Sequence, residues 1–163
     1  MSVSVLYAST ITVTETLETN IDSMAMGAAR QVVHAAFNES GTLNAASDPP
    51  ATKVAEFVQA LTDGAATVDL TALTGTNGAS VDGSGLKVQL IRVKNLGDNT
   101  LTLTVGADNG YNLAGAGFSH ALESGQIFEM HGNDATPDIA GADCEIDLAG
   151  TTTQTSEWTI VMG

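Results

Sequence analysis

The sequence is poor in cysteine, aromatic residues and basic residues, and each shortage limits what the chain can be. The single cysteine, Cys144, cannot form an intrachain disulfide, so the chain is not a small secreted domain held together by such bonds. One Trp, two Tyr and four Phe are too few to dominate an interior. The core must therefore consist mainly of Val, Leu, Ile, Ala and Met.

Basic residues number five against 19 acidic ones, so the formal net charge is −14 at pH 7. Such a surface repels nucleic acid and anionic membranes, and we expect neither as a partner. No apolar run approaches the roughly 18 residues that a membrane-spanning helix needs. The opening Met1-Ser2-Val3 lacks the basic and apolar regions of a signal peptide. We therefore expect a soluble chain made in a cytoplasm.

What the sequence does contain is typical of many short strands joined by turns. The chain has 163 residues, enough for one domain with its own core, and 43% of them are apolar. Its 17 glycines separate apolar runs in which Thr is frequent. The composition predicts a single all-β domain.

The most strand-like run is Gly85–Asn95, which holds three of the five basic residues. Apolar residues alternate with polar ones up to Leu90, but Ile91 and Val93 fall on the opposite parity. Either the strand is buried on both faces or a bulge shifts its register. We expect these three apolar residues to be buried in a strand interior to its sheet. Lys87 is expected on the solvated face, and the other two basic residues near carboxylates.

Residues 1–49 are expected to form N-terminal strands and an extended arm. Residues 2–17 alternate as one or two strands, with a break near Ala8-Ser9. Residues 18–29 have no clear period and predict an extended arm or a loop. We expect residues 1–29 to reach across to another subunit.

Two further segments are interpreted as hairpins. Residues 30–46 predict one with its turn at Asn38–Gly41. Ala51–Leu61 is ambiguous, because its apolar residues also have helical spacing and its flanks could cap a helix. The turn at Thr62–Ala65 and the alternating Ala66–Thr71 favour a strand, with the helix kept as the alternative.

The rest of the chain predicts short strands separated by long loops. Strands are expected at residues 101–105, 118–122, 126–131, 144–148 and 158–162. Surface loops are expected at residues 74–85, 106–117 and 132–141. Eight or more short antiparallel strands with regular turn signals imply a sandwich or a barrel.

Neither the histidines nor the acidic loops have the spacing of a metal site. His34, His120 and His131 are the only histidines, and no pair of them has a zinc-ligand spacing. Loop oxygens could attract calcium at two places, which are Asn133 with Asp134 and Asp138, and Asp98 with Asn99. No EF-hand periodicity supports either place. We expect no metal and no cofactor.

Asp143, Glu145 and Asp147 place three carboxylates on one face of a predicted strand, and paired carboxylates can perform glycoside hydrolysis. We expect instead a solvated face whose like charges protect a sheet edge. Cys144 points inward between them and has no His-Asp partners that would make it a nucleophile. The glycine-rich stretches lack the Lys-Ser/Thr of a phosphate loop. No catalytic residue is predicted, and we expect no enzyme.

Three parts of the chain together form a recognisable order. They are Asp63–Leu73, Gly85–Asn95, and the closing pair Ile146–Thr151 and Trp158–Val161. Their order resembles small virion structural proteins of tailed bacteriophages, of the single jelly-roll kind that decorates or cements the capsid. The resemblance covers roughly residues 50–163 and leaves residues 1–49 unplaced.

The resemblance implies a jelly-roll-like β-sandwich core, a homo-oligomer (a trimer) and a seat on the major capsid protein at the capsid surface of the virion. It supplies no functional residues. The alternative is a carbohydrate- or receptor-binding β-sandwich module of a phage tail or spike, which would stack sugars on exposed rings. Tyr111 in a groove with Asp108 and Asn109 would favour that alternative. An enzyme or a metal-dependent module is the third possibility.

Overall fold

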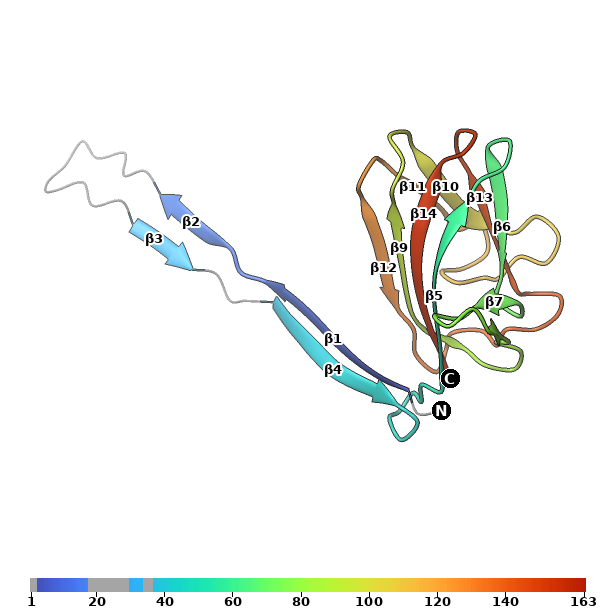
Figure 1. Cartoon of the computed structure of the whole chain (residues 1–163). Coiled ribbons are helices and arrows are strands. Elements are labelled where there is room, and N and C mark those ends of the chain that lie inside the picture. The colour runs from blue at the N-terminus through green and yellow to red at the C-terminus, as the bar shows by residue number, and fades with distance from the viewer. Residues whose placement is uncertain (1–2, 18–29, 34–36) are drawn as a thin grey trace, which may run out of the picture. The chain divides into compact units, whose positions relative to one another are not determined.

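The computed structural model describes residues 3–17, 30–33 and 37–163. The chain divides into two compact units, Val5–Thr42 and a larger one that combines Met1–Ser4 with Leu43–Gly163. Throughout the described ranges every regular element is a β-strand, so the all-β prediction is confirmed. These strands are numbered β1 to β14, and Figure 1 labels all of them except β8.

The smaller unit consists of two strand pairs. β1 (Ser4–Ile11) pairs with β4 (Phe37–Asn44), as Figure 1 shows. β2 (Thr14–Leu17) runs antiparallel to β3 (Arg30–Val33). We call these four strands the ribbon. The arm predicted at residues 18–29 lies outside the described residues.

Two predictions for the ribbon were wrong. The turn predicted at Asn38–Gly41 lies inside β4, and the break predicted near Ala8-Ser9 lies inside β1, which ends at Ile11. Gly41 provides space for a ring: a Cβ at this position would lie 2.6 Å from the hydroxyl oxygen of Tyr7. Glycine therefore marks a close approach between β1 and β4 here, a use that sequence cannot distinguish from a turn.

The larger unit is a sandwich of two four-stranded antiparallel sheets, seen edge-on in Figure 1. The first has the order β12-β9-β14-β5, with β5 at Lys53–Ala60, β9 at Val88–Asn95, β12 at Ile127–His131 and β14 at Thr155–Met162. The second has the order β11-β10-β13-β6, with β6 at Ala65–Asp69, β10 at Leu101–Val105, β11 at Ser119–Leu122 and β13 at Glu145–Ala149. The β-sandwich prediction is confirmed.

The ambiguous segment before residue 62 is the strand β5. Ala55 and Phe57 belong to the core side, whereas Val58 is 61% exposed on the other face. Apolar residues on both faces of one strand produced the apparent helical spacing. The strand interpretation is therefore confirmed, and the helix is excluded.

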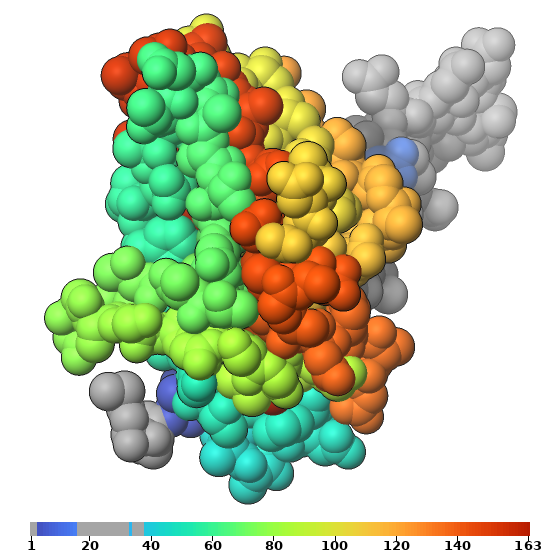
Figure 2. Space-filling view, turned by 90° about the vertical axis from the view of Figure 1, so that its right-hand side faces the viewer, coloured from blue at the N-terminus to red at the C-terminus, as the bar shows by residue number. Residues whose placement is uncertain are grey.

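Residues 74–85 are not entirely the surface loop that was predicted. They contain most of a short hairpin in which β7 (Leu73–Thr74) pairs with β8 (Ser80–Val81). The Gly75 amide donates to the Ala79 carbonyl at 2.8 Å and closes the turn. Figure 2 shows this hairpin in yellow-green, projecting from the sandwich. Strands of two residues are too short to produce a recognisable alternation.

A bulge in β9 explains its change of parity. The consecutive residues Val161 and Met162 of β14 stand opposite Leu90 and Val88, so β9 holds one extra residue, Gln89. A bulge of this kind moves every later side chain to the opposite face. Both alternatives are confirmed, because Leu90 and Ile91 follow the bulge on opposite faces of the strand and are both buried.

β9 also lies inside its sheet, between β12 and β14, as predicted. Leu90, Ile91 and Val93 are 6%, 1% and 0% exposed, so their predicted burial is confirmed. The register places Glu129 opposite Arg92 on the neighbouring strand. The basic residues of β9 are thus arranged beside carboxylates of the chain itself.

The core between the sheets is built around Trp158 of β14. Its ring is 1% exposed and stacks on Phe57 of β5, with a centroid distance of 6.0 Å and an interplanar angle of 9°. Its indole Nε1 donates to Ser156 Oγ at 2.8 Å, which satisfies the only polar atom of the ring. Aliphatic residues from both sheets fill the remaining interior.

Candidate functional site

The loop considered for calcium surrounds a lysine ammonium group. Lys87 Nζ donates to the carbonyls of Asp134 at 3.1 Å and Thr136 at 2.7 Å, and it lies 3.1 Å from Asp138 Oδ1. The Asn133 side chain accepts from the backbone two residues later, at 2.8 Å, in an Asx turn. Two of the three residues proposed for a metal ion, Asp134 and Asp138, thus contact a cation that the chain supplies. The Lys87 side chain is 32% exposed, so it keeps part of its surface in solvent while its ammonium group contacts this loop.

The histidines are not brought together where the structure describes them. His34 lies outside the described residues. His120 on β11 packs against Phe128 with a centroid distance of 5.1 Å, and His131 on β12 lies 3.2 Å from Glu129 Oε1. β11 and β12 belong to different sheets. In the described part of the chain, no group of three or more His, Cys, Asp or Glu residues could hold a metal ion.

The three predicted carboxylates do not all lie on one strand. β13 begins at Glu145, so Asp143 precedes the strand. Asp147 accepts hydrogen bonds from Thr67 Oγ1 at 2.7 Å and from the Ala107 amide at 3.1 Å. β13 lies between β10 and β6, so the prediction that these charges protect a sheet edge was wrong. Hydroxyl and amide donors on neighbouring segments explain why a central strand tolerates the charge.

Cys144 is a core residue, as predicted, with 5% of its surface exposed. Burial raises the pKa of its thiol, and the neighbouring carboxylates of Asp69 and Glu145 raise it further. A buried thiol that keeps its proton is a poor nucleophile.

Tyr111 is fully buried and cannot stack on a sugar. Its hydroxyl donates to the Pro137 carbonyl at 2.7 Å and accepts from the Val88 amide at 3.3 Å. Burial raises the pKa of Tyr111 to about 12, and the charge of Asp138 adds to the shift. The neighbouring Asn109 uses its carbonyl to accept two backbone amides from the start of β13. The ring fixes the end of the sandwich and forms no binding groove.

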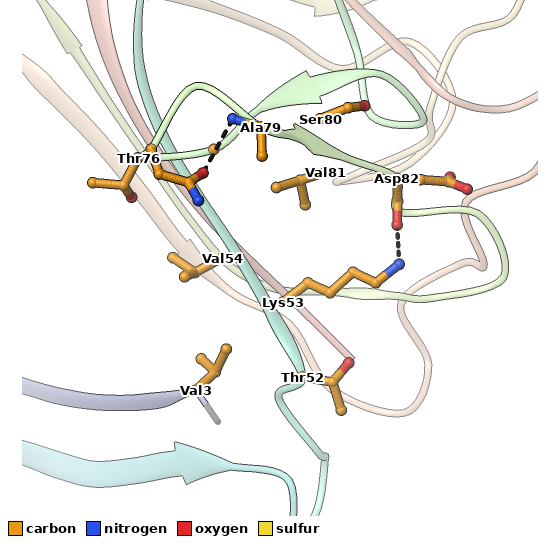
Figure 3. Close-up of a pocket in the computed structure, with 11 residues that line it drawn as sticks. Val3, Thr52, Lys53, Val54, Thr76, Ala79, Ser80, Val81 and Asp82 are labelled. Atoms are coloured by element: carbon orange, nitrogen blue, oxygen red, sulfur yellow. Dashed lines mark hydrogen bonds between the residues drawn. The ribbon is translucent and has the colours of Figure 1, made fainter. Parts of the chain in front are cut away.

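One concave feature of the larger unit was not found from sequence. It is a hollow of about 540 Å³, which we call the β5 hollow, and Figure 3 shows its lining. The lining residues are Val3, Thr52, Lys53, Val54, Gly75, Thr76, Asn77, Ala79, Ser80, Val81 and Asp82. Three separate parts of the sequence therefore meet here, and no local sequence motif predicts the hollow.

Lys53 gives one side of the β5 hollow its shape. Its Nζ donates to the backbone carbonyl of Asp82, so the ammonium lies against the hairpin rather than inside the hollow (Figure 3). Side-chain and backbone hydrogen bonds from Ser84 lower the pKa of Asp82. The surface that lines the hollow is mainly apolar, with Val3, Val54 and Val81 among its residues, so the hollow suits an apolar side chain better than a charged ligand.

No helix in the described segments is long and apolar enough to cross a membrane. Comparison with protein-family models, with curated proteins and with solved structures finds no match to the chain.

Proposed function

We propose that the chain is a non-enzymatic virion structural protein, a capsid decoration or cement protein that binds and stabilises the major capsid lattice of a tailed bacteriophage. In this role it forms a homo-oligomer, a trimer, on the outer capsid surface. Its partners are other copies of itself and the major capsid protein. Neither nucleic acid nor a membrane takes part.

The strand order of the sandwich carries this proposal. Its eight strands pair as first with last, β5–β14, then β6–β13, β9–β12 and β10–β11, moving inward along the chain. A long hairpin rolled into two sheets has this pairing, and it supports a jelly-roll arrangement. Jelly rolls are frequent in viral capsid domains. The segments that resemble phage decoration proteins lie in this unit.

The distribution of polar groups also supports a structural role. Acidic side chains that could have formed a site are used within the fold, as Asp138 beside Lys87 and Asp147 beside Thr67 illustrate. A cementing protein acts by burying surface between neighbours and needs no reacting group. The ribbon supplies such a surface, because several large apolar side chains on it are exposed.

A carbohydrate- or receptor-binding module of a tail or spike is the second candidate, because jelly rolls also occur in lectins. The ring expected to bind sugar, Tyr111, is buried. This burial weakens the second candidate relative to the first.

Immunogold electron microscopy distinguishes the two. An antibody raised against the purified chain is applied to intact virions of the phage that encodes it, with pre-immune serum as the control. The proposal expects gold particles over the heads. Labelling confined to the tail would favour the binding module, and unlabelled virions would overturn both.

A further inference from the structure

The ribbon exposes apolar side chains that it cannot bury by itself. Leu6 is 80% exposed, Ile11 and Val33 are 58% and 65% exposed, and Val13, between β1 and β2, is 52% exposed. An isolated two-stranded sheet is marginally stable in water, and exposed apolar patches of this kind mark interaction surfaces. The ribbon therefore requires a partner surface.

The sandwich, in turn, has an unpaired strand edge. β5 pairs only with β14 among the described strands. The Leu61 amide donates to the Gln154 carbonyl at 2.8 Å. In an antiparallel pair every second residue bonds to the neighbouring strand, so this bond determines which residues of β5 face β14. The backbone groups of Val54, Glu56 and Val58 consequently point away from β14. They are available to another extended strand.

The β5 hollow lies beside this edge. Val54 of β5 and Val81 of β8 both line it, and Figure 3 shows their side chains around the same space. A strand added to a sheet edge gains backbone hydrogen bonds, and pockets beside the edge receive its alternate side chains. The edge and the hollow together suit an extended segment with an exposed apolar residue.

Charge favours β1 as that segment. β1 reads Ser-Val-Leu-Tyr-Ala-Ser-Thr-Ile and contains no Asp, Glu, Lys, Arg or His, whereas β5 carries one charge of each sign, on Lys53 and Glu56. Two copies that each bear a net charge of −14 repel one another over most of their surfaces. The contact of β1 with β5 brings together segments without net charge. Both strands have eight residues, and among the described strands β1 pairs with β4 alone.

We propose that β1 of one copy pairs with the β5 edge of a second copy and seats Leu6 in the β5 hollow. The two surfaces differ, so the contact is heterologous. Repeating it forms a closed ring when the rotation from one copy to the next adds up to a full turn. The inference rests on the proposed function only for the existence of a homo-oligomer. It identifies the two surfaces that hold the oligomer together.

The first test measures the mass of the purified full-length chain by light scattering after size exclusion, without any capsid. Leu6→Glu on the ribbon and Ala79→Glu at the β5 hollow replace exposed residues, so neither change disturbs the core. We expect the wild-type chain to be an oligomer and both variants to have the mass of a monomer. Ile127→Glu on the opposite edge strand, β12, is the matched control and retains the oligomer. A monomeric wild-type chain, or an unchanged Leu6→Glu oligomer, would overturn the proposal.

The second test shows which surfaces meet. A chain with Leu6→Cys is mixed with a differently tagged chain with Ala79→Cys and oxidised, and the buried Cys144 is retained in both. We expect a disulfide-linked species that carries both tags. Products that carry one tag only, or an intrachain disulfide when both changes are made in one chain, would contradict the contact. Because these readouts need no capsid, an oligomer that fails to label virions would reject the proposed function and leave this contact standing.

Discussion

Gln154 Nε2 donates to Asn95 Oδ1 at 2.9 Å, although both side chains are almost completely buried. The same Gln154 amide reaches the Asn99 carbonyl, and Asn95 Nδ2 donates to the carbonyls of Asn99 and Leu122. The network joins the turn after β9 to the turn before β14 and to the end of β11. It also engages the Asn99 carbonyl, one of the oxygens considered for calcium.

This network predicts a large and non-additive loss of stability. Asn95→Ala leaves several buried partners without a hydrogen bond and should cost about 2–4 kcal/mol, more than Gln154→Ala at about 1–3 kcal/mol. The double variant should lose less than the sum, because the two side chains share a bond. Urea unfolding followed by Trp158 fluorescence measures these values. Asn77→Ala, in an exposed turn, is the control and should change stability by less than about 1 kcal/mol. Strict additivity would contradict the network.

Replacing Gln89 should be harmless or beneficial. This bulge residue is 1% exposed, its Nε2 makes one long bond of 3.3 Å to the Gly163 carbonyl, and its Oε1 has no partner within the described residues. Gln89→Met keeps the volume and removes a buried polar group, so we expect stability to stay equal or rise by up to about 1 kcal/mol. Gly163 retains its bond from the Lys87 amide. A loss above about 1 kcal/mol in thermal or urea unfolding would show that the amide is required.

Lys87 should stabilise the loop at residues 134–138 by more than its ion pair with Asp138 alone would. Lys87→Met removes the donor to two backbone carbonyls and should cost about 1–2 kcal/mol, with faster hydrogen exchange at the Thr136 amide. Asp138→Asn keeps an acceptor oxygen and removes only the charge of a side chain that is 67% exposed, so it should cost less than about 1 kcal/mol. Equal effects of the two variants, measured by exchange mass spectrometry and unfolding, would assign the role to the charge pair instead.

Tyr111 predicts a specific loss of stability at alkaline pH. Its pKa is raised from 10.0 to about 12 in the folded chain, so the unfolded chain releases this proton first as pH rises. Stability is therefore unaffected by this group below pH 10, and it falls through the interval up to about pH 12, by roughly 2–3 kcal/mol. Tyr111→Phe should be less stable at neutral pH, because two hydrogen bonds are lost, but its alkaline slope should be shallower. Parallel pH profiles for the two proteins would contradict the assignment.

Sequence reasoning was most successful where one face of a segment is buried. The strands β10 and β13 alternate in sequence as they do in the structure, and the parity break of β9 indicated burial on both faces or a bulge, both of which occur. It failed where residues serve partners distant in sequence. Gly41 was interpreted as a turn residue but accommodates a ring of another strand.

The site was less predictable than the fold for the same reason. Nothing around Lys87 in the sequence indicates that its ammonium contacts carbonyls nearly fifty residues later. The β5 hollow likewise depends on how β5 meets the short β7–β8 hairpin. Periodicity reports which face of a strand is buried, but it carries no information on which loops meet at the ends of a sandwich.

The pairing of β5 with β14 also constrains the order of events during synthesis. β5 is the first strand of the sandwich to leave the ribosome, and its neighbour in the sheet is the final one. Contacts so distant along the chain make folding slow. The apolar faces of the first sandwich strands stay exposed until the last strands have been synthesised. The ribbon has already emerged by then. Nascent chains on one messenger could therefore encounter each other's ribbons before any sandwich has closed, which would make assembly and folding concurrent.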